Sequence, residues 1–559
     1  MEVILDASGA TLTLKLFADI PVTAGGDIFG QIYEYFLGNF ALAEGQGGGE
    51  FFTPRSVVQL MVEIIEPHRG KVFDPACGSG GMFVQSAKFI NEHRAELKNG
   101  ADAGDLFVYG QEKTLETVKL AKMNIAVNGL RGEVRQTNSY YEDPFDSFGQ
   151  FDYVLANPPF NVDDVALSGV EKDKRFNTYG LPRNKSKTGK KDQGKETVPN
   201  GNYLWINLFA TSLKPEGRAA LVMANSASDA RHSEADIRKT LIEQNLIYGM
   251  LTLPSNMFYT VTLPATLWFF DKSKTDERIL FIDARNIFTQ IDRAHREFSS
   301  AQVQNIAIIS HLRKGNSERY VGLVDQYFEQ GAAKLSETEP KVKPIAEELL
   351  AVLDAAEGKT AVNDLLMQWK EVSKLTEHYQ QYKKSHGSLK DSSKKNAAQI
   401  ALREKFDPFF EKLHQDLKVL DKAVRSVEKV QGGASNGNGA RNSDKQLKAV
   451  KGKLSELHTE MKSAEESFKH IAWLQERFPK AEYEDVTGLC KLATLDEIKE
   501  QDYSLNPGRY VGVVIEEDGK TEDEFIADLE AHTEELERLA EQAATLSKVV
   551  ITGLRELTK

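Results

Sequence analysis

Short apolar runs alternate with longer amphipathic segments between about Gly26 and Gln290, and this alternation constrains the fold more than any other feature of the chain. Runs rich in β-branched and aromatic residues are typical of strands, whereas apolar residues three or four apart are typical of helices. The predicted strands are Lys71–Asp74, Phe107–Gly110, Glu133–Thr137, Phe151–Ala156, Arg218–Met223, Ile247–Leu253, Thr266–Phe270 and Ile279–Asp283. The predicted helices are Met82–Leu97, Leu115–Asn128, Tyr203–Leu213 and Glu234–Gln244. Because strands this apolar are buried on both faces, we expect a doubly wound, mostly parallel α/β sheet that binds ligands beyond the carboxyl ends of its strands.

The composition restricts the class of protein. The 559 residues include 70 lysines and arginines against 83 aspartates and glutamates, which gives a net charge of −13. This charge argues against a free-standing basic DNA-binding protein, although it permits a local basic patch. Cys77 and Cys490 are too few for a disulfide framework or a structural zinc site, so we expect a cytoplasmic protein without a metal site. No apolar run has the length that a membrane span needs.

The chain divides into regions of different character. We expect a short N-terminal lead at 1–48, the α/β domain at 49–330, a helical insert at 337–470, a small module at 471–520 and a C-terminal helix at 521–559. Gln431–Asp444, rich in Gly, Ser and Asn, predicts a flexible break inside the helical insert. Apolar residues seven apart from Leu529 to Leu557 predict a helix that packs on a partner helix, and the pattern equally allows a helix folded back on its own chain.

One segment of the α/β region is strongly basic. Glu171–Lys195 contains nine basic residues against three acidic ones, a local charge of +6. The basic residues are Lys172, Lys174, Arg175, Arg183, Lys185, Lys187, Lys190, Lys191 and Lys195. We expect such a segment to be mobile when nothing is bound to it.

A glycine-rich turn, VFDPACGSGGMF from Val72 to Phe83, follows the first predicted strand and precedes a predicted helix. Its glycines allow positive φ and a close approach of the backbone to a ligand, and the helix N-terminus offers free N–H groups. A dinucleotide-binding turn would need a third glycine where Phe83 stands, so the sequence departs from that motif. Glu112, at the end of the next strand, is placed to bind ribose hydroxyls. A glycine-rich connection without a ligand is the alternative.

The tetrapeptide NPPF, Asn157–Phe160, follows the very apolar strand YVLA. Pro158 and Pro159 stiffen the turn and present Asn157 at the end of the strand. The side-chain oxygen of Asn157 and the carbonyl of Pro158 can both accept hydrogen bonds from one –NH2 group, and Phe160 can stack on a planar base. Asn-Pro also occurs in ordinary turns, so the tetrapeptide alone is only moderately specific. Together with the glycine-rich turn earlier in the same sheet, it is a strong indication of a functional site.

A third motif, GEFFTPR at residues 49–55, stands just before the predicted sheet. Thr53 and Pro54 predict the start of a helix, with Thr53 as its cap. Phe51 and Phe52 can cover an adenine or a methionine group, and burial in the core explains them equally well.

Together these motifs resemble those of the amino-group DNA methyltransferases, specifically the modification subunits of type I restriction–modification systems. The resemblance extends over nearly the whole chain, from DIFGQIYEYFLGNFA at residue 27 to SLNPGRYVG at residue 504. The order of the motifs resembles that of the enzymes that methylate adenine at N6, with S-adenosyl-L-methionine as the cofactor. In that family a helical domain of considerable size precedes YEYF, which implies that residues 1–48 contain only a remnant of it.

The resemblance also implies which residues form the site. The implied cofactor contacts are Gly49, Glu50, Phe51, Phe52, Thr53, Pro54, Asp74, Ser79, Gly80 and Gly81, with Glu112 on the ribose. The implied catalytic residues are Asn157, Pro158, Pro159 and Phe160.

The expected chemistry follows from the amino group of adenine, whose nitrogen is a poor nucleophile because its lone pair is delocalised into the ring. Accepting both amino protons at Asn157 and at the Pro158 carbonyl favours a pyramidal nitrogen whose lone pair points at the methyl donor. A base inside a duplex cannot reach such a pocket, so the target must flip out, with Phe160 as its stacking partner.

The resemblance implies double-stranded DNA as the substrate and a complex with a specificity subunit. A second modification subunit and a restriction subunit are the further partners that it implies. We expect Lys172–Lys195 to contact phosphates near the flipped base, although a solvated linker fits its charge equally well. Two other functions stay open: an inactive assembly subunit of such a complex, and a protein glutamine N-methyltransferase, a class that also uses an Asn-Pro-Pro-aromatic motif.

Overall fold

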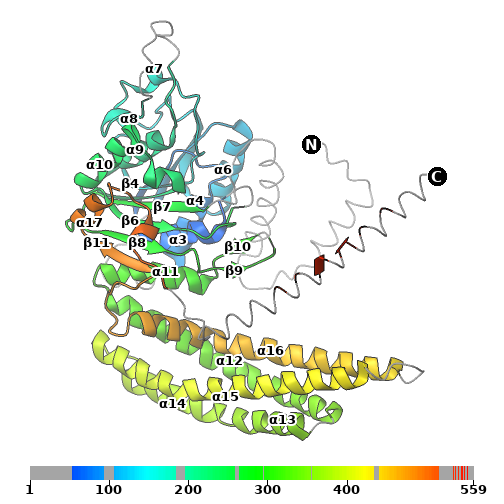
Figure 1. Cartoon of the computed structure of the whole chain (residues 1–559). Coiled ribbons are helices and arrows are strands. Elements are labelled where there is room, and N and C mark those ends of the chain that lie inside the picture. Colours follow the sequence, from blue (N-terminus) through cyan, green and yellow to red (C-terminus); the bar gives the residue numbers. More distant parts are fainter. Residues whose placement is uncertain are drawn as a thin grey trace. The chain divides into compact units, whose positions relative to one another are not determined.

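The computed structural model describes residues 53–92, 106–183, 196–258, 264–293, 295–353, 356–432 and 440–514, together with single positions between 533 and 551. Contacts divide the chain into two units, Met1–Val511 and Gly512–Lys559. The first unit holds a large sheet with helices on both faces and a group of long helices (Figure 1). In the second unit, the positions described from 533 onward are helical and exposed, and most of the predicted partner helix lies outside the described residues.

Within the described residues, nine strands form one sheet in the order β11-β8-β6-β7-β5-β4-β1-β2-β3. Their bounds are β1 (Gly70–Asp74), β2 (Leu106–Glu112), β3 (Arg131–Gln136), β4 (Phe151–Ala156), β5 (Leu213–Ala224), β6 (Ile247–Thr252), β7 (Ala265–Asp271), β8 (Ile279–Asp283) and β11 (Cys490–Ala493). All of the predicted strands are present, and β4 and β8 have the predicted bounds. A separate ribbon pairs β9 (Thr289–Gln290) with β10 (Arg296–Glu297).

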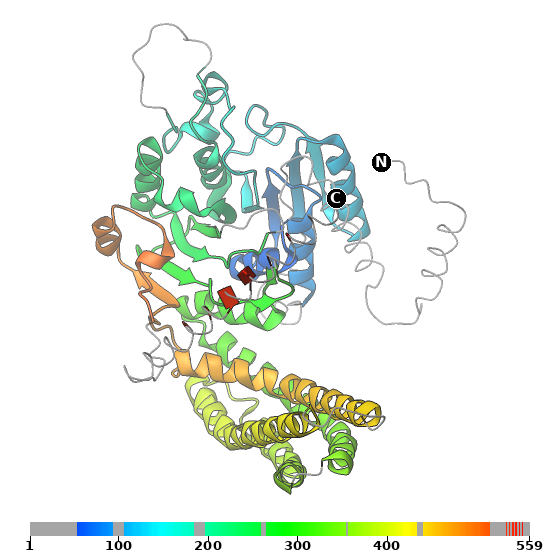
Figure 2. The same ribbon diagram turned by 45° about the vertical axis from the view of Figure 1, so that its right-hand side comes forward.

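Alternate residues of the central strands belong to different hydrophobic cores, as a sheet covered on both faces requires. In β4, Tyr153 and Leu155 belong to one core, whereas Val154 and Ala156 belong to the other. The first core includes α3 (Arg55–Ile65), α4 (Gly81–Glu92), α6 (Leu115–Val127) and α11 (Ser300–Arg313). The second includes α9 (Asn202–Ser212), α10 (Ser233–Glu243) and α17 (Leu495–Glu500). The predicted doubly wound α/β class is therefore confirmed, with helices on both faces of the sheet (Figure 2).

The sheet is mostly parallel, as predicted, but β7 runs antiparallel to both of its neighbours, β5 and β6. The pairs β1–β2, β1–β4, β2–β3, β4–β5 and β6–β8 are parallel. The connection from Thr252 to Ala265 is at the lower limit of length for a helical crossover, so a reversal of direction is the simpler path.

The small module expected at 471–520 is part of this sheet. Its strand β11 pairs antiparallel with β8, with Cys490 opposite Ile282. Close to it, the ring of Tyr510 stacks on that of Phe281 with their centroids 3.9 Å apart. Residues that follow β8 by about 200 positions therefore complete this edge of the sheet.

Between α11 and β11 the chain forms long helices that pack against one another (Figure 1). They are α12 (Ser317–Val352), α13 (Ala356–Trp369), α14 (Val372–His386), α15 (Ser392–Gly432) and α16 (Ala440–Arg477). Aromatic side chains fill the core between these helices. The ring centroid of Phe468 lies 4.6 Å from that of Phe406 and 4.9 Å from that of Phe410. Helices α15 and α16 extend into both ends of the predicted break, of which only 433–439 lie outside the described residues. None of the helices that the structure describes is long and apolar enough to cross a membrane.

Glu66, at the end of α3, joins the sheet to these helices through a cluster of cations. Its carboxylate lies 2.8 Å from Arg319 of α12, 3.4 Å from Lys314 and 3.9 Å from Arg218 of β5. Burial alone would raise the pKa of Glu66, but the surrounding cations outweigh that effect and lower it. His311 is buried beside them, and burial lowers its pKa to about 4, so its ring is neutral at pH 7. One carboxylate therefore pairs with cations of β5, of α12 and of the residue that follows α11.

We predict that Glu66→Gln destabilises the protein at pH 7 by about 3 kcal/mol, because it leaves several partly buried cations without their counter-charge. The pKa of Glu66 is lower in the folded state than its ordinary value of 4.5, so its stabilising contribution is fully present above that value. The contribution is lost as the pH falls through the lowered folded-state pKa. Urea unfolding at pH 7 and near pH 4 should therefore show a difference between the two proteins that shrinks at the lower pH.

The control for this experiment is Glu337→Gln, which removes an exposed carboxylate that pairs with Lys334, one turn earlier in α12, at 3.4 Å. Its unfolding curve should match that of the wild type at both pH values. If Glu66→Gln also matched the wild type at pH 7, Glu66 would not hold the two parts together.

Candidate active site

The carboxyl ends of β1 and β4 lie side by side, because these strands are parallel neighbours with Phe73 opposite Val154. The glycine-rich turn leaves β1 at Asp74, and Asn157 follows the last residue of β4. Two motifs separated by about 80 residues in the sequence therefore meet at one edge of the sheet. The strand order reverses between β1 and β4, and doubly wound sheets bind their ligands at such a switch point.

The glycine-rich turn has the backbone conformations that its glycines were expected to allow. Gly78 and Gly80 have φ values of 51° and 85°, in the left-handed region. The turn is closed by a hydrogen bond from the Gly80 N–H to the Cys77 carbonyl at 2.8 Å, and α4 begins at Gly81. Among the residues that the structure describes, a Cβ atom added at Gly78 or Gly81 would meet nothing within 4 Å, which leaves room beside the turn and the N-terminus of α4.

Two carboxylates support this turn from below. Glu112 accepts hydrogen bonds from the backbone N–H of Gly78 at 3.2 Å and of Thr114 at 2.9 Å. Asp74 is 1% exposed and accepts a hydrogen bond from the Ala76 N–H at 3.0 Å. Burial and the nearby charge of Glu112 raise the pKa of Asp74 well above its ordinary value, against the effect of the Ala76 hydrogen bond. The two carboxyl groups therefore hold the backbone of the turn in place at the end of β1.

Ser79 and Gly80 lie in the same turn, and the Ser79 carbonyl accepts a hydrogen bond from the Asn124 side chain of α6 at 2.7 Å. Asn124 is buried, so this bond fixes the turn to the helix that follows β2. The predicted cofactor residues Asp74, Ser79, Gly80, Gly81 and Glu112 thus lie close together around the ends of β1 and β2.

Asn157 is half-buried at the end of β4, and its amide is held in one orientation. Its Nδ2 donates to the hydroxyl of Thr53 at 2.9 Å. Its Oδ1 is buried and has no hydrogen-bond partner among the residues that the structure describes. A buried amide oxygen without a partner costs free energy unless a ligand supplies the donor. The geometry leaves an acceptor available for a substrate N–H.

The rest of the NPPF motif continues from the strand into a turn. Pro158 is buried, Pro159 is exposed, and Phe160 is half-buried and packs against both hydrophobic cores. The four predicted catalytic residues therefore lie together at the same edge of the sheet as the glycine-rich turn.

The predicted role of Thr53 as a helix cap is wrong. Helix α3 begins at Arg55 with Pro54 as its N-cap and without a side-chain cap, and the Thr53 hydroxyl binds Asn157 instead. This contact spans 104 residues of sequence, so local capping rules could not reveal it. Of the other predicted cofactor contacts, Gly49, Glu50, Phe51 and Phe52 lie outside the described residues.

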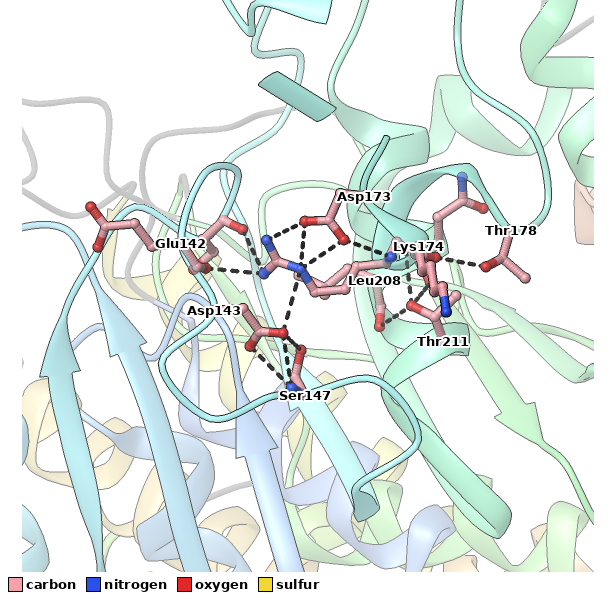
Figure 3. A network of polar contacts seen from close by, with 11 residues as sticks. Glu142, Asp143, Ser147, Asp173, Lys174, Thr178, Leu208 and Thr211 are labelled. Carbon is pink, nitrogen blue, oxygen red and sulfur yellow. Dashed lines mark hydrogen bonds and ion pairs between the residues drawn. The ribbon is translucent and has the colours of Figure 1, made fainter. Parts of the chain in front are cut away.

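Arg175, predicted to be one of the DNA-contacting cations, is instead buried and structural. Its guanidinium forms an ion pair with Asp173 at 2.7 Å, lies 3.6 Å from Asp143, and donates to the carbonyls of Ser139 and Glu142 (Figure 3). The local charge pattern missed this, although an aspartate two residues earlier was a signal. Lys172, Lys174 and Arg183 of the basic segment are exposed, and 184–195 lie outside the described residues.

Three asparagines that the sequence analysis did not single out support the NPPF turn. The backbone N–H of Asn161 donates to Asn202 Oδ1 at 2.8 Å, and Asn161 Oδ1 accepts from Asn200 at 2.9 Å and from Asn202 at 3.0 Å. The only available signal was the cluster of asparagines in PNGN, next to the start of α9.

Comparison with known proteins gives a consistent result. The sequence model of the family N-6 DNA Methylase matches residues 24–326 and 442–519, more than half of the chain. The type I restriction enzyme MjaIX methylase subunit of Methanocaldococcus jannaschii is 38% identical over 333 residues, which are 59% of this chain and 53% of that protein. The HindI methylase subunit of Haemophilus influenzae is 36% identical over 327 residues, 58% of this chain and 67% of that protein. The chain thus spans between about half and two thirds of the length of these relatives.

Among solved structures, the methyltransferase subunit of a type I restriction–modification system from Streptococcus thermophilus is 25% identical, with a TM-score of 0.46. The match covers 55% of this chain and 62% of that one. The two parts matched by the family model are joined in the fold, because β11 in the second part pairs with β8 in the first. Most of the described residues between the two matched parts lie in the long helices α12 to α15. The chain therefore belongs to the N-6 DNA methylase family.

Proposed function

We propose that this protein transfers the methyl group of S-adenosyl-L-methionine to the N6 amino group of adenine in DNA, as the modification subunit of a type I restriction–modification complex. The observation that carries the proposal is Asn157, whose amide is anchored through Nδ2 and offers a buried Oδ1 beside the glycine-rich turn. Membership of the N-6 DNA methylase family and the names of the relatives support the reaction and the type of complex.

The cofactor fits the residues around the end of β1. The open space at Gly78 and Gly81 gives room for a ligand close to the backbone, and the N-terminus of α4 suits its carboxylate. Glu112 lies at the strand end where a ribose would be bound, and the buried carboxyl of Asp74 stands near it at the start of the turn. When bound, the cofactor supplies an electrophilic methyl group on a sulfonium.

Asn157 and Pro158 then act on the amino group of the substrate. Asn157 Oδ1 accepts one N–H and the Pro158 carbonyl accepts the other, which localises the lone pair on nitrogen as the new N–C bond forms. Because Thr53 fixes the amide of Asn157 beforehand, the acceptor needs no reorganisation during the reaction. The same two acceptors stabilise the positive charge that the nitrogen gains as the bond forms, and one proton then leaves the methylated amino group to water.

Adenine reaches this edge of the sheet only when it has left the duplex. Phe160, half-buried next to Asn157, is placed to stack on the flipped base. The exposed cations Lys172, Lys174 and Arg183 supply phosphate contacts nearby, but the net charge of −13 requires that partners provide most of the affinity for DNA.

The proposed partners are double-stranded DNA and a specificity subunit that reads the sequence, with a second modification subunit and a restriction subunit in the full complex. The exposed, helical positions of the tail, including Leu536 and Leu539, supply apolar surface for a partner helix. Such a complex works on cytoplasmic DNA, which agrees with the low cysteine content.

The decisive experiment uses the complex formed by co-expressing the chain with its neighbouring reading frames. We predict that Asn157→Ala lowers kcat for methyl transfer to DNA by at least about 100-fold, because an acceptor that acts in the transition state is lost. Binding of S-adenosyl-L-methionine, measured by calorimetry, should stay unchanged. Mass spectrometry of digested DNA should identify N6-methyladenine as the product.

The same experiment separates the alternatives. An inactive assembly subunit would show no methyl transfer in the wild-type complex, and a glutamine methyltransferase would label protein and leave DNA unlabelled. A cytosine product, or equal activity of Asn157→Ala and wild type, would contradict the proposed reaction.

The contact between Thr53 and Asn157 generates a second prediction. Thr53→Val keeps the shape of the side chain and removes the acceptor for Asn157 Nδ2, so kcat should fall about five- to tenfold, the effect of one neutral hydrogen bond. Thr53→Ser keeps the hydroxyl and should stay within about twofold of the wild type. Equal loss in both variants would indicate that Thr53 acts through packing.

A further inference from the structure

The turn that follows the NPPF motif has a strained residue at its centre. Asn161 has φ = 56°, in the left-handed region that non-glycine residues rarely adopt. Because Asn161 directly follows Phe160, its backbone conformation sets the direction in which the chain leaves the NPPF motif. Three asparagine side chains hold this conformation, and we call Asn161, Asn200 and Asn202 the asparagine cluster.

The asparagine cluster is closed by reciprocal hydrogen bonds. Asn202 accepts from the Asn161 backbone N–H at 2.8 Å and donates to Asn161 Oδ1 at 3.0 Å. Asn200 donates to the same Oδ1 at 2.9 Å and accepts from the Asn202 backbone N–H at 2.8 Å. Asn202 is the first residue of α9 and is 3% exposed, so the cluster is fixed to an element of the second core.

The backbone continues the same connection. The Gly201 N–H donates to the Val162 carbonyl at 2.7 Å, and a Cβ at Gly201 would lie 2.9 Å from the hydroxyl of Tyr140. Further along, the Val198 N–H donates to Val165 at 2.9 Å. Residues 161–167 and 196–202 therefore run side by side in opposite directions, with the basic segment between their far ends.

We propose that the asparagine cluster positions the catalytic turn, so that Asn157 and Phe160 hold the flipped adenine in line with the methyl donor. The inference rests on the proposed function. The three asparagines act through the turn and touch neither adenine nor cofactor, so they are positioning residues. We expect their removal to leave the cofactor turn of β1 intact, because their hydrogen bonds within the described part of the chain do not reach it.

Two variants test the asparagine cluster in the full complex. Asn161→Gly removes the shared acceptor but tolerates the left-handed backbone, so it changes the cluster without adding strain. Asn202→Ala removes both of the bonds that its side chain makes with Asn161. Each should lower kcat about 10- to 100-fold, the effect expected when a reacting group is misplaced by about 1 Å. KM for DNA and the Kd of the cofactor should change less than about threefold.

Two further variants serve as rescue and control. Asn161→Asp keeps the oxygen that accepts from Asn200 and Asn202 and tolerates positive φ, so kcat should stay within about threefold of the wild type. Asn245→Gly is the matched control, because Asn245 also has a left-handed backbone, with φ = 57°, and its side chain donates to the Lys274 carbonyl at 3.2 Å. Asn245 precedes β6, at the edge of the sheet opposite to the catalytic turn. The kcat of the Asn245→Gly variant should therefore equal that of the wild type.

The outcomes are distinguishable. Wild-type kcat in both Asn161→Gly and Asn202→Ala overturns the inference, and so does a fall in kcat that is matched by equal losses of cofactor affinity and melting temperature. A lower kcat with both of those properties retained, reversed in Asn161→Asp, supports it. A wild-type complex that methylates no adenine overturns the proposed function and this inference with it, whereas an active wild type with equally active variants overturns this inference alone.

Discussion

The parallel pairing of β1 with β4 is the constraint on which the site depends. Because Val72 lies opposite Tyr153 and Phe73 opposite Val154, the two strands end together, and the turns that follow them must share one edge of the sheet. A slip of one residue would exchange the faces of every side chain in β4, so that Tyr153 and Leu155 would enter the core that now holds Val154 and Ala156. The relative position of the glycine-rich turn and Asn157 is therefore fixed by the hydrophobic cores, far from the reacting atoms.

The pairing of the strands does not determine the paths of the loops between them, and polar side chains with several hydrogen-bond or ion-pair partners hold these loops in place. Glu66 joins α3 to β5 and α12, Arg175 joins its segment to the loop after β3, and Asn202 joins the turn after β4 to α9. Each of them is mostly or fully buried, so an unmade bond there has a high free-energy cost. The strands define the site to within a few residues, and these side chains define the path of each loop.

The sequence pattern was sufficient for the sheet and for the two motifs at its edge. Short, continuous apolar runs such as YVLA, bounded by turn residues, favour buried strands, and the glycines at 78 and 80 have positive φ as their type suggests. The sequence pattern failed to predict contacts between residues that are far apart in the sequence. Strand β11 has only four residues and no clear alternation, so its pairing with β8 could not be read from CKLA. Likewise, the charge of Arg175 wrongly predicted that its side chain is exposed. The carbonyls that bind its guanidinium belong to Ser139 and Glu142, more than 30 residues earlier, so the local sequence could not reveal them.

The late arrival of β11 has a consequence for how the chain is made. An edge strand with free N–H and C=O groups is prone to pair with other chains, and β8 keeps such an edge until Cys490–Ala493 has been synthesised. At about 5 to 20 residues per second, the roughly 200 residues between the two strands take about 10 to 40 s to translate. The helices α12 to α16 are synthesised during that interval. The number of residues in these helices thus sets a delay during biosynthesis, in which β8 has not yet paired with β11.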